Sequence, residues 1–159
     1  MNDTGKFMRS RTRAQAQEGF TLIELLVVIL IIGILAAAAI ATFLTQTGKA
    51  KDSNLESTLS AVQTTEAIYA SDNNGTYSAS QTALQTIEPS LTTPFSTYNL
   101  TLSTNPSGLP SGDKGFSATG TSDSTAGGTF TLLYDGSTGQ VTKSCSQPSK
   151  SGCNASGSW

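Results

Sequence analysis

An unbroken apolar block near the N-terminus constrains this 159-residue chain more than any other feature. From Leu25 to Leu44 it reads LLVVILIIGILAAAAIATFL, and the next charged residue is Lys49. A helix of these twenty residues rises about 30 Å, the thickness of the hydrocarbon core of a bilayer. The block therefore predicts a transmembrane helix. A buried helix of a soluble protein explains it less well, because one domain of this size has too little chain to surround such a helix.

The charges that flank the block predict its orientation. Its N-terminal side carries Lys6, Arg9, Arg11 and Arg13, and positively charged flanks stay in the cytoplasm. Residues after about 50 are then expected outside the membrane, where disulfides persist. From Phe20 onward the chain has five lysines and nine carboxylates, and this acidic balance gives no electrostatic reason to bind nucleic acid.

A cleavable secretory signal is an alternative interpretation of the same block. The run AAAAIA at Ala36–Ala41 offers small residues of the kind that signal peptidases require. Two features argue against this interpretation. The block is long for a signal peptide, and Glu24 stands near its start, where a carboxylate costs free energy that a disposable segment has no reason to carry.

The junction between the basic segment and the apolar block has a pattern of its own. It reads EGFTLIELLVVILIIGILAAAAI from Glu18 to Ile40, and it places Gly19, Phe20 and Glu24 directly before the apolar helix. This pattern resembles the processing and assembly motif of type IV pilins and of type II secretion pseudopilins. Many members of this family carry a helix-breaking proline near the position of Ala41, and this chain has none there.

The resemblance implies roles for three residues. In this family a membrane aspartyl peptidase cuts after the glycine and methylates the new amino terminus, so residues 1–19 would be a leader, cut between Gly19 and Phe20. The family's glutamate is thought to pair with that amine on a neighbouring subunit, so Glu24 would set the register of subunits in a filament. The alternative for Glu24 is a solvated carboxylate at the level of the lipid headgroups.

The helix is expected to continue beyond the membrane as an amphipathic segment. Its apolar positions are Leu55, Leu59, Val62 and Tyr69, with Ala61 and Ile68 widening the same face. This helical spacing predicts a seam against a β-sheet. The helix is expected to span about 78 Å from Phe20 to Ser71 and to end in the turn at 72–75, where asparagine and glycine tolerate left-handed geometry.

Beyond this turn the sequence predicts a short helix and a small antiparallel sheet. The helix covers Ser80–Ile87 with Ser80 as its cap, and Pro89 and Pro94 end it and start a loop. The predicted strands are 96–103, 114–120, 128–134 and 140–144, and the turn DGSTG joins the last two as a hairpin. The predicted fold class is α+β and pilin-like, with a long N-terminal helix packed on an antiparallel sheet.

Four segments follow from these predictions. They are a leader at 1–19, a transmembrane and filament-core helix at 20–48, an amphipathic continuation at 49–74, and an exported β-rich head at 75–159. The family often closes a C-terminal loop with a disulfide, which implies a bond between Cys145 and Cys153. Closing so short a loop would stabilise the fold by about 2–3 kcal/mol. A plain staple and a loop shaped for subunit contacts both remain open.

We expect no catalysis, no cofactor and no metal. The chain has no histidine, the commonest general base, and two cysteines alone are too few to ligate zinc. Some pseudopilins bind calcium through clustered loop carboxylates, and no Asp-x-Asp cluster occurs here.

The expected function is a structural subunit of a type IV pilus that serves adhesion, motility or DNA uptake. A type II secretion pseudopilin and a single-pass anchored surface protein that never polymerises are the alternatives. The expected partners are further copies of the chain, the prepilin peptidase and methyltransferase, and an assembly platform with its ATPase. The precursor is expected in the cytoplasmic membrane, with its head outside, and the assembled form in an extracellular pilus.

Overall fold

A computed structural model describes residues 19–109, 114–124, 127–150 and 152–159. The predicted leader lies outside these residues except for Gly19, as do residues 110–113 and 125–126 in the segments that join the predicted strands. The chain divides into two compact units, Met1–Ala39 and Ile40–Trp159, which are described separately below.

Helix α1 spans Leu22–Asp72 without interruption and so contributes to both units. The side-chain oxygen of Thr21 accepts a hydrogen bond from the backbone nitrogen of Glu24 at 3.2 Å, which caps the first turn. In the region where many family members carry a proline, the hydroxyls of Thr45 and Thr47 bond to carbonyls one helical turn earlier. The helix is continuous there.

The second unit contains a four-stranded sheet in the order β1-β2-β3-β4. The strands are β1 at Thr101–Thr104, β2 at Gly115–Ser122, β3 at Gly128–Asp135 and β4 at Val141–Cys145. Each strand pairs antiparallel with the next, and Tyr134 faces Val141 across the predicted hairpin turn. The α+β class and the last three strands are thus confirmed.

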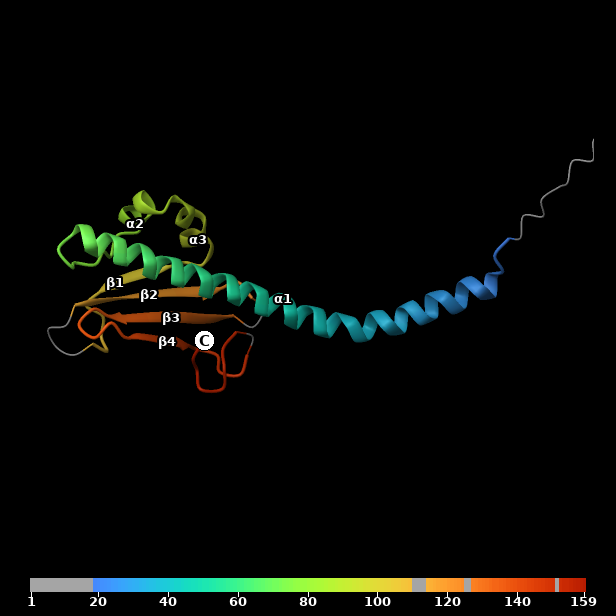
Figure 1. Cartoon of the computed structure of the whole chain (residues 1–159). Helices are drawn as coiled ribbons and strands as arrows, with labels where there is room; N and C mark the ends of the chain where they lie inside the picture. Colours follow the sequence, from blue (N-terminus) through green and yellow to red (C-terminus); the bar gives the residue numbers. More distant parts are fainter. Residues whose placement is uncertain (1–18, 110–113, 125–126, 151) are drawn as a thin grey trace, which may run out of the picture. The chain divides into compact units, whose positions relative to one another are not determined.

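The core of this unit lies between α1 and one face of the sheet (Figure 1). Helix α1 contributes Leu55, Leu59 and Val62, all fully buried, as the helical spacing predicted. Alternate residues of β2 and β3 point at them because side chains alternate along a strand. These are Phe116, Ala118, Phe130 and Leu132.

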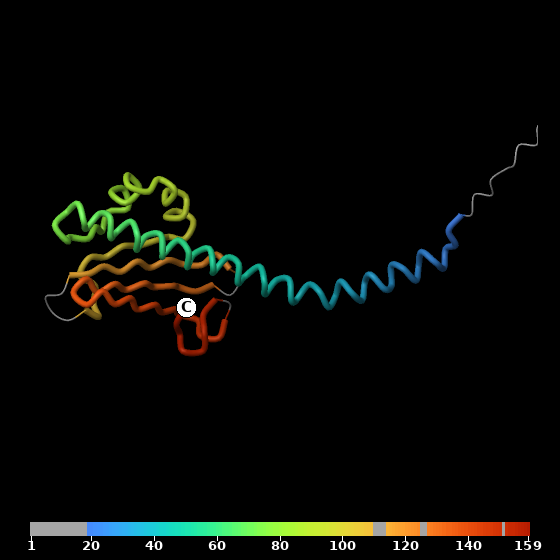
Figure 2. The backbone as a smooth tube through the Cα atoms, in the orientation of Figure 1, coloured from blue at the N-terminus to red at the C-terminus, as the bar shows by residue number. Residues whose placement is uncertain are grey.

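Three short helices complete this core. They are α2 at Gln81–Ile87, the 3-10 helix η1 at Pro89–Leu91, and α3 at Thr92–Thr97. The backbone trace places them on the same side of the sheet as α1 (Figure 2). They contribute the buried side chains of Leu84, Leu91 and Phe95.

The C-terminal end of α1 and the N-terminal start of α2 are as predicted. Asn74 and Gly75 adopt positive φ angles of 54° and 74°, and the nitrogen of Gly75 donates to the carbonyl of Ala70 at 2.8 Å, which ends α1. The hydroxyl of Ser80 accepts a hydrogen bond from the nitrogen of Ala83 at 3.3 Å, so Ser80 caps α2.

The predicted burial of Ile68 is wrong, because its side chain is 47% exposed. Ile68 lies six residues after Val62, which is about 240° around a helix. Glu66 and Ala70 occupy the inward positions of that part of α1 instead.

The predicted strand at 96–103 is also wrong in its first half, which belongs to α3 and the turn after it. Pro94 sits in the first turn of α3, where no hydrogen-bonded N–H is required, and Pro89 opens η1 in the same way. The two prolines therefore start helical turns rather than a loop.

Candidate functional site

The surface of α1 up to Ala39 is apolar and uncovered. Every residue from Leu22 to Ala39 is exposed, including Leu22 at 82% and Leu35 at 65%. In the part of the chain that the structure describes, α1 is the one helix long and apolar enough to cross a bilayer. An apolar surface of this extent needs a membrane or another protein against it.

Gly33 leaves a hollow in this apolar surface. The hollow is shallow and open, and it is lined by Leu26, Ile29, Leu30, Gly33, Ile34 and Ala37. No atom lies within 4 Å of a Cβ placed on Gly33. A small residue in such a position lets a second helix approach closely.

The three residues with predicted roles in processing and assembly lie together where α1 begins. Gly19 precedes the helix and has no atom within 4 Å of an added Cβ, while the side chain of Phe20 is 85% exposed. Glu24 lies in the first turn, where the helix dipole favours a negative charge. The backbone nitrogen of Glu24 is held by Thr21, and its side chain is exposed.

The disulfide between Cys145 and Cys153 is present and closes a loop next to the sheet. Cys145 is the last residue of β4, and its nitrogen donates to the carbonyl of Gly157 at 2.8 Å. Cys153 is 4% exposed. The loop is therefore folded back onto the strand that it follows.

Asp52 connects helix α1 to this loop. It is 2% exposed, and its Oδ2 accepts a hydrogen bond from the backbone nitrogen of Gly152 at 2.9 Å. Its Oδ1 accepts a hydrogen bond from the hydroxyl of Ser122, the last residue of β2. A Cβ on Gly152 would lie 2.8 Å from the Cβ of Asp52 and 2.6 Å from Oε1 of Glu56, so the close approach requires glycine.

Glu56 lies beside the hydrogen bond between Asp52 and Gly152. Burial raises the pKa of its carboxyl, the charge of Asp52 raises it further, and Lys143 opposes both. The ammonium group of Lys143 lies 4.0 Å from the centre of the Trp159 ring. These charges surround the point where α1, β4 and the disulfide loop meet.

Comparison with known proteins identifies a motif in the N-terminal segment. Residues 15–40 match the family model described as the prokaryotic N-terminal methylation motif, which contains Gly19, Phe20 and Glu24. The N-terminal segment therefore carries this motif. This confirms the resemblance on which the sequence prediction rests.

A relative supports the same assignment. The type IV narrow pilus major component PilA5 of Thermus thermophilus is 49% identical to the chain over 51 residues, which is 32% of this chain and 44% of that protein. The chain thus matches less than half the length of this curated relative. No solved structure matches the chain.

The second unit contains a second buried carboxylate, Glu66. Its Oε2 accepts a hydrogen bond from the backbone nitrogen of Ser78 at 2.9 Å. Its Oε1 has no hydrogen-bond partner among the described residues. Burial raises the pKa of Glu66 to about 7, and the bond from Ser78 opposes this shift.

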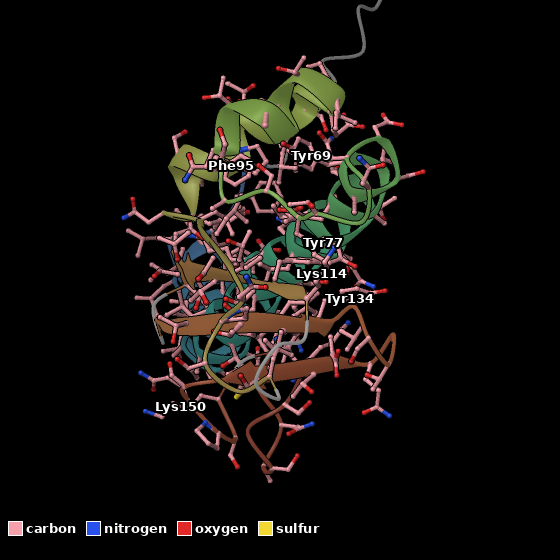
Figure 3. All side chains as sticks on the ribbon, turned by 90° about the vertical axis from the view of Figure 1, so that its left-hand side faces the viewer. Tyr69, Tyr77, Phe95, Lys114, Tyr134 and Lys150 are labelled. Carbon is pink, nitrogen blue, oxygen red and sulfur yellow. A yellow bond between two sulfur atoms is a disulfide. The ribbon has the colours of Figure 1, made fainter. Side chains whose placement is uncertain are left out.

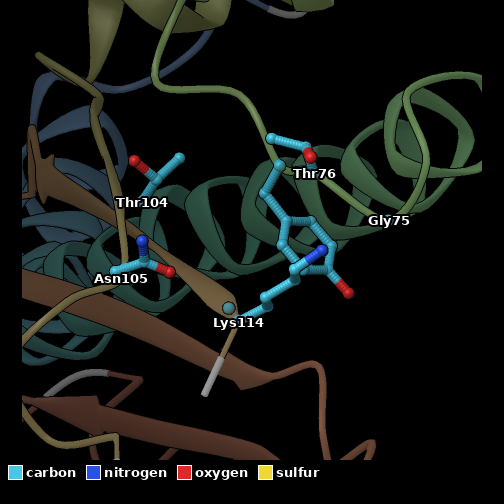
Figure 4. Close-up of a pocket in the computed structure, with 7 residues that line it drawn as sticks. Gly75, Thr76, Thr104, Asn105 and Lys114 are labelled. Carbon is cyan, nitrogen blue, oxygen red and sulfur yellow. The ribbon is translucent and has the colours of Figure 1, made fainter. Parts of the chain in front are cut away.

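An aromatic group and a small pocket lie next to Ser78. The ring of Tyr77 is centred 5.3 Å from that of Phe116 and 5.7 Å from that of Tyr134. Figure 3 shows Tyr77, Tyr134 and Lys114 near one another at one end of the sheet. Tyr77 and Lys114 also line a pocket of about 130 Å³ (Figure 4).

Sequence reasoning missed both buried carboxylates, although a usable signal was present. Asp52 and Glu66 extend the spacing of the apolar stripe, since the positions 52, 55, 59, 62 and 66 are three or four residues apart. The stripe was defined by apolar residues alone, so its charged members were left out. Among the described residues no group of three or more histidine, cysteine or acidic side chains could hold a metal ion.

Proposed function

We propose that this chain is the precursor of a filament subunit of the type IV pilin kind. The observation that carries the proposal is the uncovered apolar half of α1 placed directly after Gly19 and Phe20, within the matched methylation motif. Packing this surface against copies of itself removes it from water and from lipid. The similarity to a major pilus component favours a pilin over a pseudopilin.

Processing between Gly19 and Phe20 prepares the helix for this packing. Cleavage removes the basic leader, whose charges hold the N-terminus in the cytoplasm. It also leaves a positively charged amine on Phe20, four residues before Glu24. N-methylation of that amine by the same enzyme is part of the proposal.

Glu24 is proposed to pair with the Phe20 amine of a neighbouring copy. A carboxylate in an apolar environment needs a cation close by, and the sequence has none between Phe20 and Gly48 apart from the new amine. The pairing fixes how far one helix is displaced along the next. Glu24 is therefore the proposed register residue.

The location and partners follow from the same proposal. The precursor lies in the cytoplasmic membrane with its head outside, where the Cys145–Cys153 bond can persist. Subunits leave the membrane against the free energy of burying about twenty apolar residues, which calls for an ATP-driven assembly machine. The head is structural and carries no catalytic role.

The intact mass of the protein in filaments sheared from the cell surface, compared with the membrane fraction, tests the proposal. We expect a sheared chain that begins at methylated Phe20 and lacks the two hydrogens removed by disulfide formation. A processed chain found only in the membrane fraction would favour a pseudopilin. A chain that still begins at Met1 would favour a plain membrane anchor, and one that begins beyond Ala41 would favour a secretory signal.

The register role of Glu24 has its own test. We expect the Glu24→Gln chain to be cleaved normally but to yield few or no filaments, because the amide cannot neutralise the amine. The control is Asp72→Asn, which removes the same charge from an exposed position at the end of α1. Normal filament yield from Glu24→Gln would rule out the register role and leave Glu24 as a solvated carboxylate.

A further inference from the structure

Filament assembly gives no role to Glu66, a fully buried carboxyl in the head. One of its oxygens is bonded to the nitrogen of Ser78, and the other has no partner among the described residues. Among the described residues the ion pair is that of Lys51 with Asp123, so no described cation pairs with Glu66. An ionised carboxyl in this position is buried without a counter-charge, which costs free energy.

Glu66 holds the segment that connects α1 to α2. The nitrogen of Ser78 donates to Glu66, and the hydroxyl of Ser78 accepts from the nitrogen of Ser80 at 3.0 Å. Ser80 in turn caps α2. Residues 73–76, 79 and 80 are all exposed, so the connection is held on the head mainly through Tyr77 and Ser78.

We propose that Glu66 is a pH-responsive latch: its neutral carboxyl holds the 73–80 connection against α1, and its ionised form weakens this docking. The inference concerns the head alone and does not depend on polymerisation. Gly75, Thr76 and Tyr77 of the connection also line the pocket of Figure 4. Release of Ser78 therefore alters one wall of that pocket.

The charged and titratable groups near Glu66 leave its negative charge unpaired, since Lys114, which lines the same pocket as Tyr77, makes no ion pair with it. Tyr77 faces it from the connection, and Tyr134 of β3 contacts Tyr77 in turn. Asp135, at the end of β3, also acts on Tyr77. Burial, the charge and hydrogen bond of Tyr134, and the negative charges of Glu66 and Asp135 all raise the pKa of Tyr77, which stays neutral at physiological pH.

The direction of the pH response follows from burial. The pKa of Glu66 is about 7 in the docked state and has an ordinary value of 4.5 when the carboxyl is in water. The docked state therefore binds the proton more tightly than the released state. Docking is strongest below pH 4.5, weakens as the pH rises from 4.5 to 7, and levels off above pH 7.

Hydrogen exchange of the full chain in uncharged detergent micelles tests the latch. The protection factor of the Ser78 amide, corrected for the intrinsic pH dependence of exchange, is followed from pH 4.5 to 8.5. We expect it to fall by up to about tenfold per pH unit until pH 7 and then to remain constant. Amides of β2 and β3, which pair with each other, serve as the internal reference.

Two variants separate the latch from a general effect of charge. In Glu66→Gln we expect the protection of Ser78 to be independent of pH, because glutamine accepts the same hydrogen bond and does not titrate. The matched control Glu56→Gln removes a carboxylate from the same helix and should leave the pH dependence unchanged. Equal pH dependence in Glu66→Gln and in the unaltered chain would overturn the proposal.

A measurement on the unaltered chain keeps the proposal testable if Glu66→Gln does not fold. The carboxyl carbon of Glu66 is followed by NMR through the same pH range. A midpoint well above that of an ordinary glutamate, together with loss of Ser78 protection over the same range, supports the latch. A midpoint at the ordinary value of a glutamate would overturn it.

Discussion

The two halves of helix α1 differ in how their apolar side chains are distributed around the helix. Up to Ala39 apolar residues occur on every side, and all are exposed. From Asp52 to Ala70 they form one stripe, which is buried against the sheet and the short helices. One continuous helix thus has a half that needs partners outside the chain and a half that finds them within it. The distribution of apolar residues around the helix, rather than their number, distinguishes the two.

The largest difference between the halves should come from Leu59→Ala and Ile29→Ala. Leu59 is fully buried, so its truncation should lower the free energy of unfolding of the head by about 2–5 kcal/mol. Ile29 is 60% exposed and is not a member of the core cluster, so Ile29→Ala should leave that free energy unchanged. Denaturant unfolding in detergent, followed by Trp159 fluorescence, measures both. Equal losses would contradict the comparison.

A charge in the first half should produce the reverse pattern. Placing arginine at the centre of a membrane helix costs about 2.5–3.5 kcal/mol on insertion scales, so Ile29→Arg should reduce membrane insertion and abolish filaments. The unfolding of the head should not change. Fractionation of cells measures the first effect, and Trp159 fluorescence measures the second. Normal filaments from Ile29→Arg would show that this surface is not buried in the assembly.

The disulfide loop between Cys145 and Cys153 stabilises the head, in which the second half of α1 is packed. Replacing Cys145 and Cys153 by serine should lower the free energy of unfolding by about 2–3 kcal/mol, because the unfolded chain regains the freedom of that loop. Insertion of the first half should be unaffected. Thiol labelling before and after reduction checks that the bond is present in the unaltered chain. Loss of insertion in the serine variant would contradict the separation of the halves.

Asp52 should contribute less than the disulfide but more than an exposed residue. Asp52→Ala leaves the Gly152 amide and the Ser122 hydroxyl without an acceptor, which costs about 1–3 kcal/mol when such groups are buried. The disulfide loop should also exchange its amide hydrogens faster. Lys51→Ala, which removes an exposed ion pair, is the control and should change the stability by less than about 1 kcal/mol.

The comparison also explains what the sequence could predict. The methylation motif and the apolar stripe at Leu55, Leu59 and Val62 are local patterns with a fixed period, and both predictions are confirmed. The hairpin at β3 and β4 was predictable because its turn has a composition of its own. Helix α3 was not, because its six residues, TTPFST, are too few to show a helical period, and only the tertiary packing of Phe95 shows that they form a turn of helix.

The buried carboxylates were predictable only in part, for a different reason. Whether Asp52 or Glu66 is buried depends on partners that lie far along the chain, such as Gly152 for Asp52. No local pattern brings these groups together. Their positions on the stripe identify them as inward-facing, but only the folded arrangement shows that Asp52 has partners for both oxygens and Glu66 for one.

The smallest effect is expected at Ile68, on the outer face of the second half. Its side chain is 47% exposed, so Ile68→Ser should change the free energy of unfolding of the isolated subunit by less than about 0.5 kcal/mol. The stability of sheared filaments of the same variant then shows whether Ile68 faces solvent or a neighbouring copy. If the filaments lose stability while the subunit does not, a neighbouring copy covers Ile68, and this half also has partners outside the chain. If neither changes, its contacts remain within the head, and the contrast between the two halves is complete.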